Sequence, residues 1–262
     1  MPCKSPSDIV GSIDAAGCRK VEIDTGRLLL LGVLAGAYIA VGGLLAVVVG
    51  GGMPGVAALN PGLQKFVFGA VFPVGLMLVV IAGAELFTGN TATCIPAALN
   101  HRISWGSVAR NWTLSYAGNF VGSLLVAFFL TYLTGLLAAD PWRTTIVGIA
   151  TAKVSQGFLP LLLKGIGCNW LVCLAVWMAT SADGVGGKIL AIWFPIMAFV
   201  AIGFEHSVAN MYFIPAGMMY GANVTWVRFL LGNFVPVTLG NIIGGALFVG
   251  AAYRYLFPDR ES

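Results

Sequence analysis

Three ionisable side chains interrupt apolar stretches of this sequence. Glu85 ends the apolar run Gln64–Glu85, and Glu205 and His206 follow the run Lys188–Gly203. Ionisable residues at membrane depth are rare and mark functional sites. Imidazole gains or loses a proton near neutral pH, which suits the movement of a weak-acid anion. We therefore expect His206 to face a polar passage, with Glu205 beside it.

The two carboxylates occupy matching surroundings. Glu85 is followed five residues on by Asn90, and Glu205 is followed at the same distance by Asn210. An unpaired buried carboxylate is very costly, so backbone N–H groups or these asparagines are expected to bind both. Their predicted role is to stabilise the local loops rather than to contact a substrate. The sequence leaves open whether the two groups are ionised or protonated.

The same two places predict broken helices. The segments Glu85–Thr93 and Gly203–Asn210 are rich in Gly, Thr, Ser and Asn, and each is followed by an apolar half-span and a proline, Pro96 or Pro215. Irregular backbone at membrane depth survives only where protein buries it or where it lines a wet cavity. Paired breaks of this kind indicate a binding site. The alternative of two extramembrane loops would make Asn210–Gly221 a seventh span, for which it is too short.

The composition predicts that lipid covers most of this chain. Of its 262 residues, 58% are hydrophobic and only 9% are charged, whereas soluble domains carry about 25% charged residues. A net charge of +4 without a basic run gives no support for nucleic-acid binding. A helix needs about 20 apolar residues to cross a bilayer. Six spans are predicted, at Leu28–Val49, Gln64–Glu85, Asn111–Ala139, Phe158–Thr180, Lys188–Gly203 and Phe229–Tyr253.

An even number of spans places both termini on one side of the membrane. That side then receives nine of the 14 lysines and arginines, and the other side receives five. The positive-inside rule therefore predicts cytoplasmic termini in a cell membrane. We expect a cytoplasmic segment 1–27, a channel domain 28–257 and a cytoplasmic tail 258–262.

The first 27 residues lack the apolar stretch of a signal peptide. Ser5 is the predicted cap of a helix that starts at Pro6. This helix would place Ile9, Val10, Ile13 and Ala16 on one face. We expect an amphipathic helix that lies at the membrane surface.

The two halves of the chain resemble each other. Phe72-Pro73 recurs as Phe194-Pro195, and Gly118-Asn119 recurs as Gly240-Asn241, both 122 positions later. Three spans in each repeat, about 28–139 and 146–257, mean that the second copy crosses the membrane in the opposite direction. Such inverted repeats are typical of transporters, with the substrate path between the halves.

The five cysteines form no CxxC or Cys/His pattern, so neither a metal site nor a disulfide framework is indicated. No cofactor is expected either.

Three motifs resemble those of the formate/nitrite transporter family. Val80–Gly89 is similar to the first family signature, Gly165–Ala175 to the second, and Gly203–Asn210 to the stretch with the family's central histidine. Phe72–Gly83 and Thr88–Thr91 are most similar to archaeal-type formate transporters. The resemblance implies an all-α, aquaporin-like protomer with six spans, an inverted repeat, broken second and fifth helices, and its own pore. It also implies a homopentamer that carries formate, or alternatively nitrite or hydrosulfide, with possible proton coupling through the histidine.

The resemblance also implies roles for individual residues. The cytoplasmic-side constriction corresponds to Phe72, Leu76 and Phe87, and the outer constriction to Phe199 with Val172. Thr88 and His206 would face the chamber between them, Asn169 would lie beside the histidine, and Lys153 would attract anions in a vestibule. From the residues alone, the phenylalanines would be ordinary core residues and Lys153 a solvated loop charge.

Two other classes of protein are alternatives to an anion transporter, a membrane enzyme and a channel for neutral solutes. A membrane enzyme could use Glu85, Glu205 and His206 as acids and bases, but no nucleophile or metal-ligand set accompanies them. A channel for water, glycerol or ammonia would lack the paired Asn-Pro-Ala motifs, and ammonia would not need an anion-attracting lysine. Neither alternative predicts the combination of paired breaks and a central histidine.

Overall fold

Six long helices dominate the computed structural model, which describes residues 3–258. Most of the predicted tail 258–262 therefore lies outside the described residues. The helix α1 (Pro6–Glu22) precedes the first repeat. That repeat contains α2 (Thr25–Gly51), α3 (Pro54–Leu59), α4 (Pro61–Val71), α5 (Val74–Met77), η1 (Leu78–Gly83), α6 (Phe87–Thr93), α7 (Ile95–Leu99), α8 (Trp105–Leu125) and η2 (Val126–Tyr132). The second contains α9 (Trp142–Val154), α10 (Phe158–Ser181), α11 (Val185–Ile202), α12 (Ser207–Met219), η3 (Arg228–Phe234), α13 (Val235–Ile242), η4 (Ile243–Ala251) and α14 (Ala252–Leu256).

The six predicted spans are confirmed, although the bounds of the third differ. This span runs through α8 and η2 from Trp105 to Tyr132, rather than from Asn111 to Ala139. Its early polar residues resemble the water-facing end of a helix, but Asn111 is fully buried and bonds to protein. The guanidinium of Arg110 donates to the carbonyl of Ile23 at 3.1 Å. The span therefore starts earlier because protein, not water, satisfies its polar side chains.

Glycine contacts hold the long helices close together. A Cβ on Gly36 of α2 would clash with the carbonyl of Asn119 on α8, and one on Gly122 would clash with the carbonyl of Val33. The pair α10 and α13 meets in the same way, since a Cβ on Gly240 would clash with the carbonyl of Leu162. Small residues allow this close backbone approach in a membrane.

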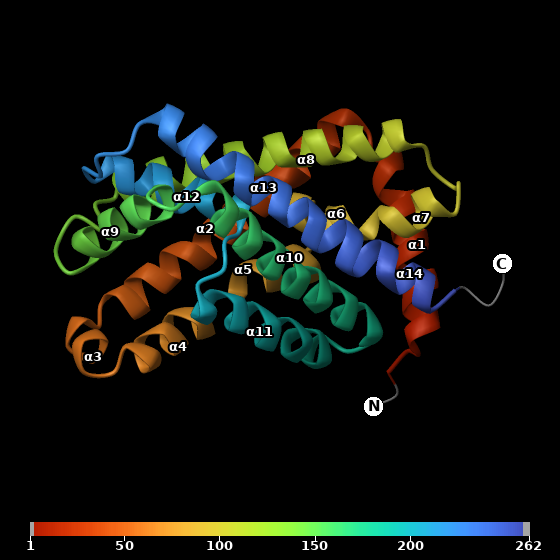
Figure 1. The fold of residues 1–262 in the computed structure, drawn as a ribbon, viewed down its shortest axis with the longest axis horizontal. Coiled ribbons are helices and arrows are strands. Elements are labelled where there is room, and N and C mark those ends of the chain that lie inside the picture. Colours follow the sequence, from red (N-terminus) through yellow and green to blue (C-terminus); the bar gives the residue numbers. More distant parts are fainter. Residues whose placement is uncertain (1–2, 259–262) are drawn as a thin grey trace.

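Both predicted breaks are present and both begin with a glycine. The second span ends at Gly83, with φ +94°, and α6 starts at Phe87. The fifth span ends before Gly203, with φ +89°, and α12 starts at Ser207. These positive φ angles favour glycine, which carries no Cβ. The half-helices α6 and α12 lie among the longer helices (Figure 1).

The N-terminal helix starts where the sequence predicts. The Ser5 side chain accepts a hydrogen bond from the Asp8 amide and caps α1. The apolar face of α1 does not lie on lipid, contrary to the expectation of a helix at the membrane surface. Protein covers it, because Ile9, Val10 and Ile13 pack against residues such as Trp177. In Figure 1, α1 lies with α7 and α14 at one end of the molecule, and α3 and α9 lie at the other.

Candidate functional site

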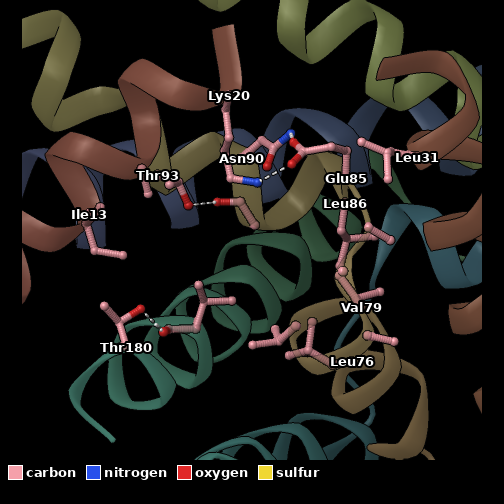
Figure 2. Close-up of a pocket in the computed structure, with 17 residues that line it drawn as sticks. Ile13, Lys20, Leu31, Leu76, Val79, Glu85, Leu86, Asn90, Thr93 and Thr180 are labelled. Carbon is pink, nitrogen blue, oxygen red and sulfur yellow. Dashed lines mark hydrogen bonds and ion pairs between the residues drawn. The ribbon is translucent and has the colours of Figure 1, made fainter. Parts of the chain in front are cut away.

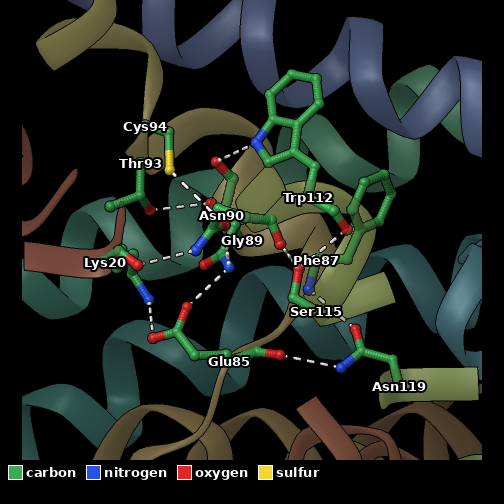
Figure 3. A network of polar contacts seen from close by, with 11 residues as sticks. Lys20, Glu85, Phe87, Gly89, Asn90, Thr93, Cys94, Trp112, Ser115 and Asn119 are labelled. Atoms are coloured by element: carbon green, nitrogen blue, oxygen red, sulfur yellow. Dashed lines mark hydrogen bonds and ion pairs between the residues drawn. The ribbon is translucent and has the colours of Figure 1, made fainter. Parts of the chain in front are cut away.

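A polar network surrounds the first break (Figure 3). Glu85 accepts hydrogen bonds from Lys20 Nζ at 2.6 Å and from Asn90 Nδ2 at 2.8 Å. Asn90 also donates to the Asn111 side-chain oxygen at 2.9 Å, and Asn111 donates to the Lys20 carbonyl at 3.2 Å. The carboxylate is therefore paired with a cation and held by an amide, as a buried charge requires.

The second break carries the same network. Glu205 accepts from Lys153 Nζ at 2.9 Å and from Asn210 Nδ2 at 2.7 Å. Asn210 donates to the Asn233 oxygen at 2.8 Å, and Asn233 donates to the Lys153 carbonyl at 2.8 Å. Each bond of the first network has its counterpart here. The predicted pairings of Glu85 with Asn90 and of Glu205 with Asn210 are both present.

One further asparagine in each repeat satisfies the irregular backbone. Asn119 donates to the Glu85 carbonyl at 2.9 Å, and its oxygen accepts from the Phe87 amide at 2.9 Å. Asn241 makes the same two bonds around the second break. Both asparagines are fully buried. The breaks persist at this depth because side-chain amides replace the missing helical partners.

Lys20 is the functional candidate that sequence reasoning missed. It stands in the first network where Lys153 stands in the second. The sequence places it in a charged N-terminal segment that resembles a solvated arm, and its partner Glu85 lies far along the chain. The repeat does not reveal it either, because Lys20 precedes the first copy and lies 133 positions before Lys153, whereas Glu85 and Glu205 are 120 positions apart.

Three cavities follow one another between the two networks. The larger vestibule has a volume of about 530 Å³, the central cavity about 10 Å³ and the smaller vestibule about 160 Å³. The larger vestibule is lined by residues that include Ile13, Lys20, Leu76, Val79, Glu85 and Leu86 (Figure 2). The central cavity is lined by Ile39, Phe72, Leu76, Leu86, Val172, Ile196, Phe199 and His206. The smaller vestibule includes Phe72, Lys153, Phe199, Glu205 and His206.

Residues shared by neighbouring cavities form the two constrictions. Leu76 and Leu86 line both the larger vestibule and the central cavity. Phe72 and Phe199 line both the central cavity and the smaller vestibule, and their rings meet edge to face at 5.9 Å. Val172 lines the central cavity between them.

These positions correct two expectations from the family resemblance. Phe87 lines none of the three cavities, because its ring packs against Tyr116 at 4.3 Å and against Trp112 on the far side of α6. Leu86, one residue earlier in the extended backbone, points into the passage instead. Phe72 forms a constriction with Phe199, on the Lys153 side, rather than with Leu76.

His206 lines the central cavity between the two constrictions. The ring is buried and stacks on Phe199 with a centroid separation of 5.9 Å. Its Nδ1 accepts a hydrogen bond from the Ala209 amide at 3.0 Å, so the ring proton sits on Nε2. That nitrogen lies 3.0 Å from Thr88 Oγ1. The imidazole is thus a neutral hydrogen-bond donor that faces the first repeat.

Asn169 has a supporting position rather than a lining one. Its amide nitrogen lies within hydrogen-bond distance of the Thr88 carbonyl, Thr91 Oγ1 and the Asn241 carbonyl, at 3.1, 2.9 and 2.6 Å. These partners belong to α6 and α13, so Asn169 ties the two repeats together next to Thr88. It forms no hydrogen bond with His206. Among the described residues, no three His, Cys, Asp or Glu side chains cluster in a way that could hold a metal ion.

The sequence and the fold both match known membrane transport proteins. The model of the formate/nitrite transporter family matches residues 7–255. This chain belongs to the formate/nitrite transporter family. It is 50% identical to a probable formate transporter of Methanothermobacter thermautotrophicus, over 97% of each chain. It is 45% identical to the formate channel BtFdhC of Bacillus thuringiensis, over 100% of this chain and 99% of the relative.

A solved structure described as a pentameric formate channel with formate bound resembles this member of the formate/nitrite transporter family. The two share a TM-score of 0.77 and 33% identity, over 89% of this chain and 97% of that one. The family consists of transporters and channels, so the membrane-enzyme alternative is excluded. The protein is a multi-pass integral membrane protein with six spans.

Proposed function

We propose that this protein carries formate across the membrane through a separate pore in each subunit of a homopentamer. The main structural support is the series of three cavities with a Lys–Glu pair at each outer end and His206 at the centre. The names of the relatives favour formate over nitrite and hydrosulfide. Both termini are proposed to face the cytoplasm, on the distribution of lysine and arginine.

The charged pairs concentrate the anion at the two mouths. Lys153 and Lys20 are each bound to one carboxylate and remain partly exposed, with 15% and 23% of their side chains accessible. Each ammonium has three donors, of which the glutamate uses one. Formate would bind to the remaining donors and would hold its charge while it is still hydrated.

The centre of the pore requires the charge to be lost. A central cavity of about 10 Å³ has room for about one water molecule, so formate must shed its hydration shell there. A charge at the bilayer centre costs at least about 2.5–3.5 kcal/mol. Formate is the anion of a weak acid. A hydronium ion in one vestibule would protonate it and leave water behind, so that it crosses between Leu86 and Phe199 as the neutral acid and releases the proton to water in the other vestibule.

The tautomer of His206 supports a hydrogen-bond donor role for its Nε2–H in this step. The Ala209 amide occupies Nδ1, so transfer of the Nε2 proton to formate would leave an imidazolate. The earlier expectation that His206 protonates the anion directly is therefore not what this geometry favours. We propose instead that Nε2–H hydrogen-bonds the substrate oxygen as it passes, in exchange for Thr88 Oγ1, which is fully buried and, against expectation, lines none of the three cavities. This replaces part of the lost hydration.

Replacement of His206 tests the proposal. In proteoliposomes, His206→Phe is expected to slow formate uptake about tenfold or more, because one hydrogen bond to a charged or polar group contributes about 1.5–3 kcal/mol. His206→Asn keeps a donor near Thr88 and is expected to retain more activity. Wild-type rate and pH dependence in both variants would contradict the proposed role.

Competition identifies the substrate. Radiolabelled formate uptake is measured with added nitrite, hydrosulfide or ammonium. Inhibition by the anions and none by ammonium is expected for an anion pathway. Faster flux of nitrite or hydrosulfide than of formate would reassign the physiological substrate within the family, and ammonium conduction would restore the neutral-solute alternative.

A further inference from the structure

The position of Lys20 depends on how α1 docks. Lys20 lies near the C-terminal end of α1, as Lys153 lies near the end of α9. Ile13, Ala16 and Lys20 line the larger vestibule from this helix. Any shift of α1 therefore moves both a wall of the vestibule and its ammonium group. The network that fixes Lys20 is complete only when α1 is seated.

The helices α1 and α9 pack against the rest of the protein through different kinds of side chain. Counted from the lysine, Asp14 of α1 occupies the place that Val147 has in α9. α9 packs through apolar residues, and its Ala150 fits against Gly217 of α12. Asp14 is a carboxylate with only 1% of its surface exposed. The α1 interface thus contains a buried charge where its counterpart contains a methyl-bearing side chain.

Asp14 is held by two other segments of the chain. Its Oδ2 accepts from Asn100 Nδ2 at 2.6 Å, and Oδ1 forms an ion pair with Arg102. Asn100 in turn accepts from Arg254 Nε of α14 at 2.6 Å. The loop after α7 therefore holds the carboxylate of Asp14 directly, and the last helix holds it through Asn100. None of these residues lines the pore cavities.

We infer that Asp14 is a positioning residue for transport, which acts through Lys20. The inference rests on the proposed role of Lys20 in attracting formate. A buried carboxylate without its cation is strongly unfavourable. Loss of Arg102 therefore favours an undocked α1 in which Asp14 reaches water, and this movement removes Lys20 from Glu85 and opens the vestibule wall.

Cys94 offers a direct reporter of docking. It is fully buried beneath α1, where a Cβ on Gly17 would lie 3.3 Å from Cys94 Cα. In a Cys3→Ser/Cys18→Ser background of the full-length protein in proteoliposomes, a polar maleimide measures access to this thiol. Formate uptake in the same vesicles gives KM and the maximal rate.

Arg102→Leu is expected to speed the labelling of Cys94. It is also expected to raise KM for formate about fivefold, the effect of losing one unit charge at about 4 Å in water, with a smaller effect on the maximal rate. Asp14→Val combined with Arg102→Leu copies the apolar docking of α9 and is expected to restore both readouts. Lys20→Met serves as the reference for the KM change.

A matched control removes an exposed acidic charge from the same region. Asp24 caps α2 and pairs with Arg27 in an exposed position. Asp24→Asn keeps the cap and is expected to leave both readouts unchanged.

Wild-type labelling in Arg102→Leu would overturn the inference, as would faster labelling with unchanged KM. Failure of the Asp14→Val/Arg102→Leu pair to restore labelling would also overturn it, because a general loss of stability would then explain the single variant. A wild-type KM in Lys20→Met would overturn the proposed role of Lys20, while the labelling results would still measure docking separately.

Discussion

Leu86 and His206 occupy the same position in the two repeats, yet their side chains differ in kind. Each is the residue directly before a half-helix, α6 or α12, and each lines the central cavity. The imidazole accepts the Ala209 amide and presents a proton to the pore, whereas leucine can only fill space. The central cavity therefore has an apolar side chain from one repeat and a hydrogen-bond donor from the other.

Leu86 is expected to set the size limit on the α1 side of the pore. Leu86→Ala removes bulk from the constriction with Leu76 and is expected to raise the acetate-to-formate flux ratio about tenfold, since one methylene group typically changes discrimination by about that factor or more. Relative rates of the two acids in proteoliposomes measure it. Phe87→Leu is the matched comparison, because Phe87 packs against Tyr116 outside the pore. An equal change in both variants would contradict this division of roles.

At this scale, the sequence predicts which residues belong to the site better than it predicts which way their side chains point. The family motifs point to His206, Thr88 and Lys153 by position alone. They do not show which of the neighbours Leu86 and Phe87 faces the pore, because the extended backbone between η1 and α6 fixes that choice through hydrogen bonds from a distant helix. Lys20 is hidden for a related reason, since its pairing with Glu85 joins segments far apart in the chain.

At the scale of the elements, the breaks are stable structures rather than frayed helix ends. A single buried asparagine bridges the two sides of each break, Asn119 in the first repeat and Asn241 in the second. Both breaks could be predicted from the sequence, because glycine and polar residues interrupt otherwise apolar runs. The roles of Asn119 and Asn241 could not be predicted, since a polar residue within a span can face the pore, bind another helix or cap a half-helix.

Asn119→Ala is expected to destabilise the protein substantially. It leaves the carbonyl of Glu85 and the amide of Phe87 buried without the partner that Asn119 supplies, and each such group costs about 1–3 kcal/mol. We expect the midpoint of thermal unfolding in detergent to fall by about 5–10 °C. Asn223→Ala, at an exposed position, is the control. Equal midpoints for Asn119→Ala and the wild type would argue that the break is not held by this side chain.

At the scale of the whole molecule, the inverted repeat accounts for most of the architecture. Six spans and two breaks follow from hydropathy and from the recurring motifs, and the comparison with known channels agrees with them. The sequence did not predict the location of α1, because an amphipathic helix has the same sequence pattern whether lipid or protein covers its apolar face. Only the contacts with residues such as Trp177 decide between them.

The proposed homopentamer with a separate pore in each subunit predicts that flux changes linearly when wild-type and inactive subunits are mixed. Wild-type and His206→Phe subunits are co-expressed in known ratios, and pentamers are isolated and checked by native mass spectrometry. Formate flux per pentamer is expected to fall in proportion to the mutant fraction, because each pore lies within one chain. A steep loss at a low mutant fraction would indicate coupled subunits, and a different oligomer mass would contradict the pentamer itself.

Each mouth of the pore holds one Lys–Glu ion pair, Lys20–Glu85 at one mouth and Lys153–Glu205 at the other. A solute that arrives from either compartment therefore meets the same charged groups before it reaches the dry centre. For the proposed transport of formate, we expect little intrinsic rectification from such a conduit. The concentration and proton gradients across the bilayer would then set the sign of net flow, so that one protein would serve a cell both in disposing of an acid and in recovering it.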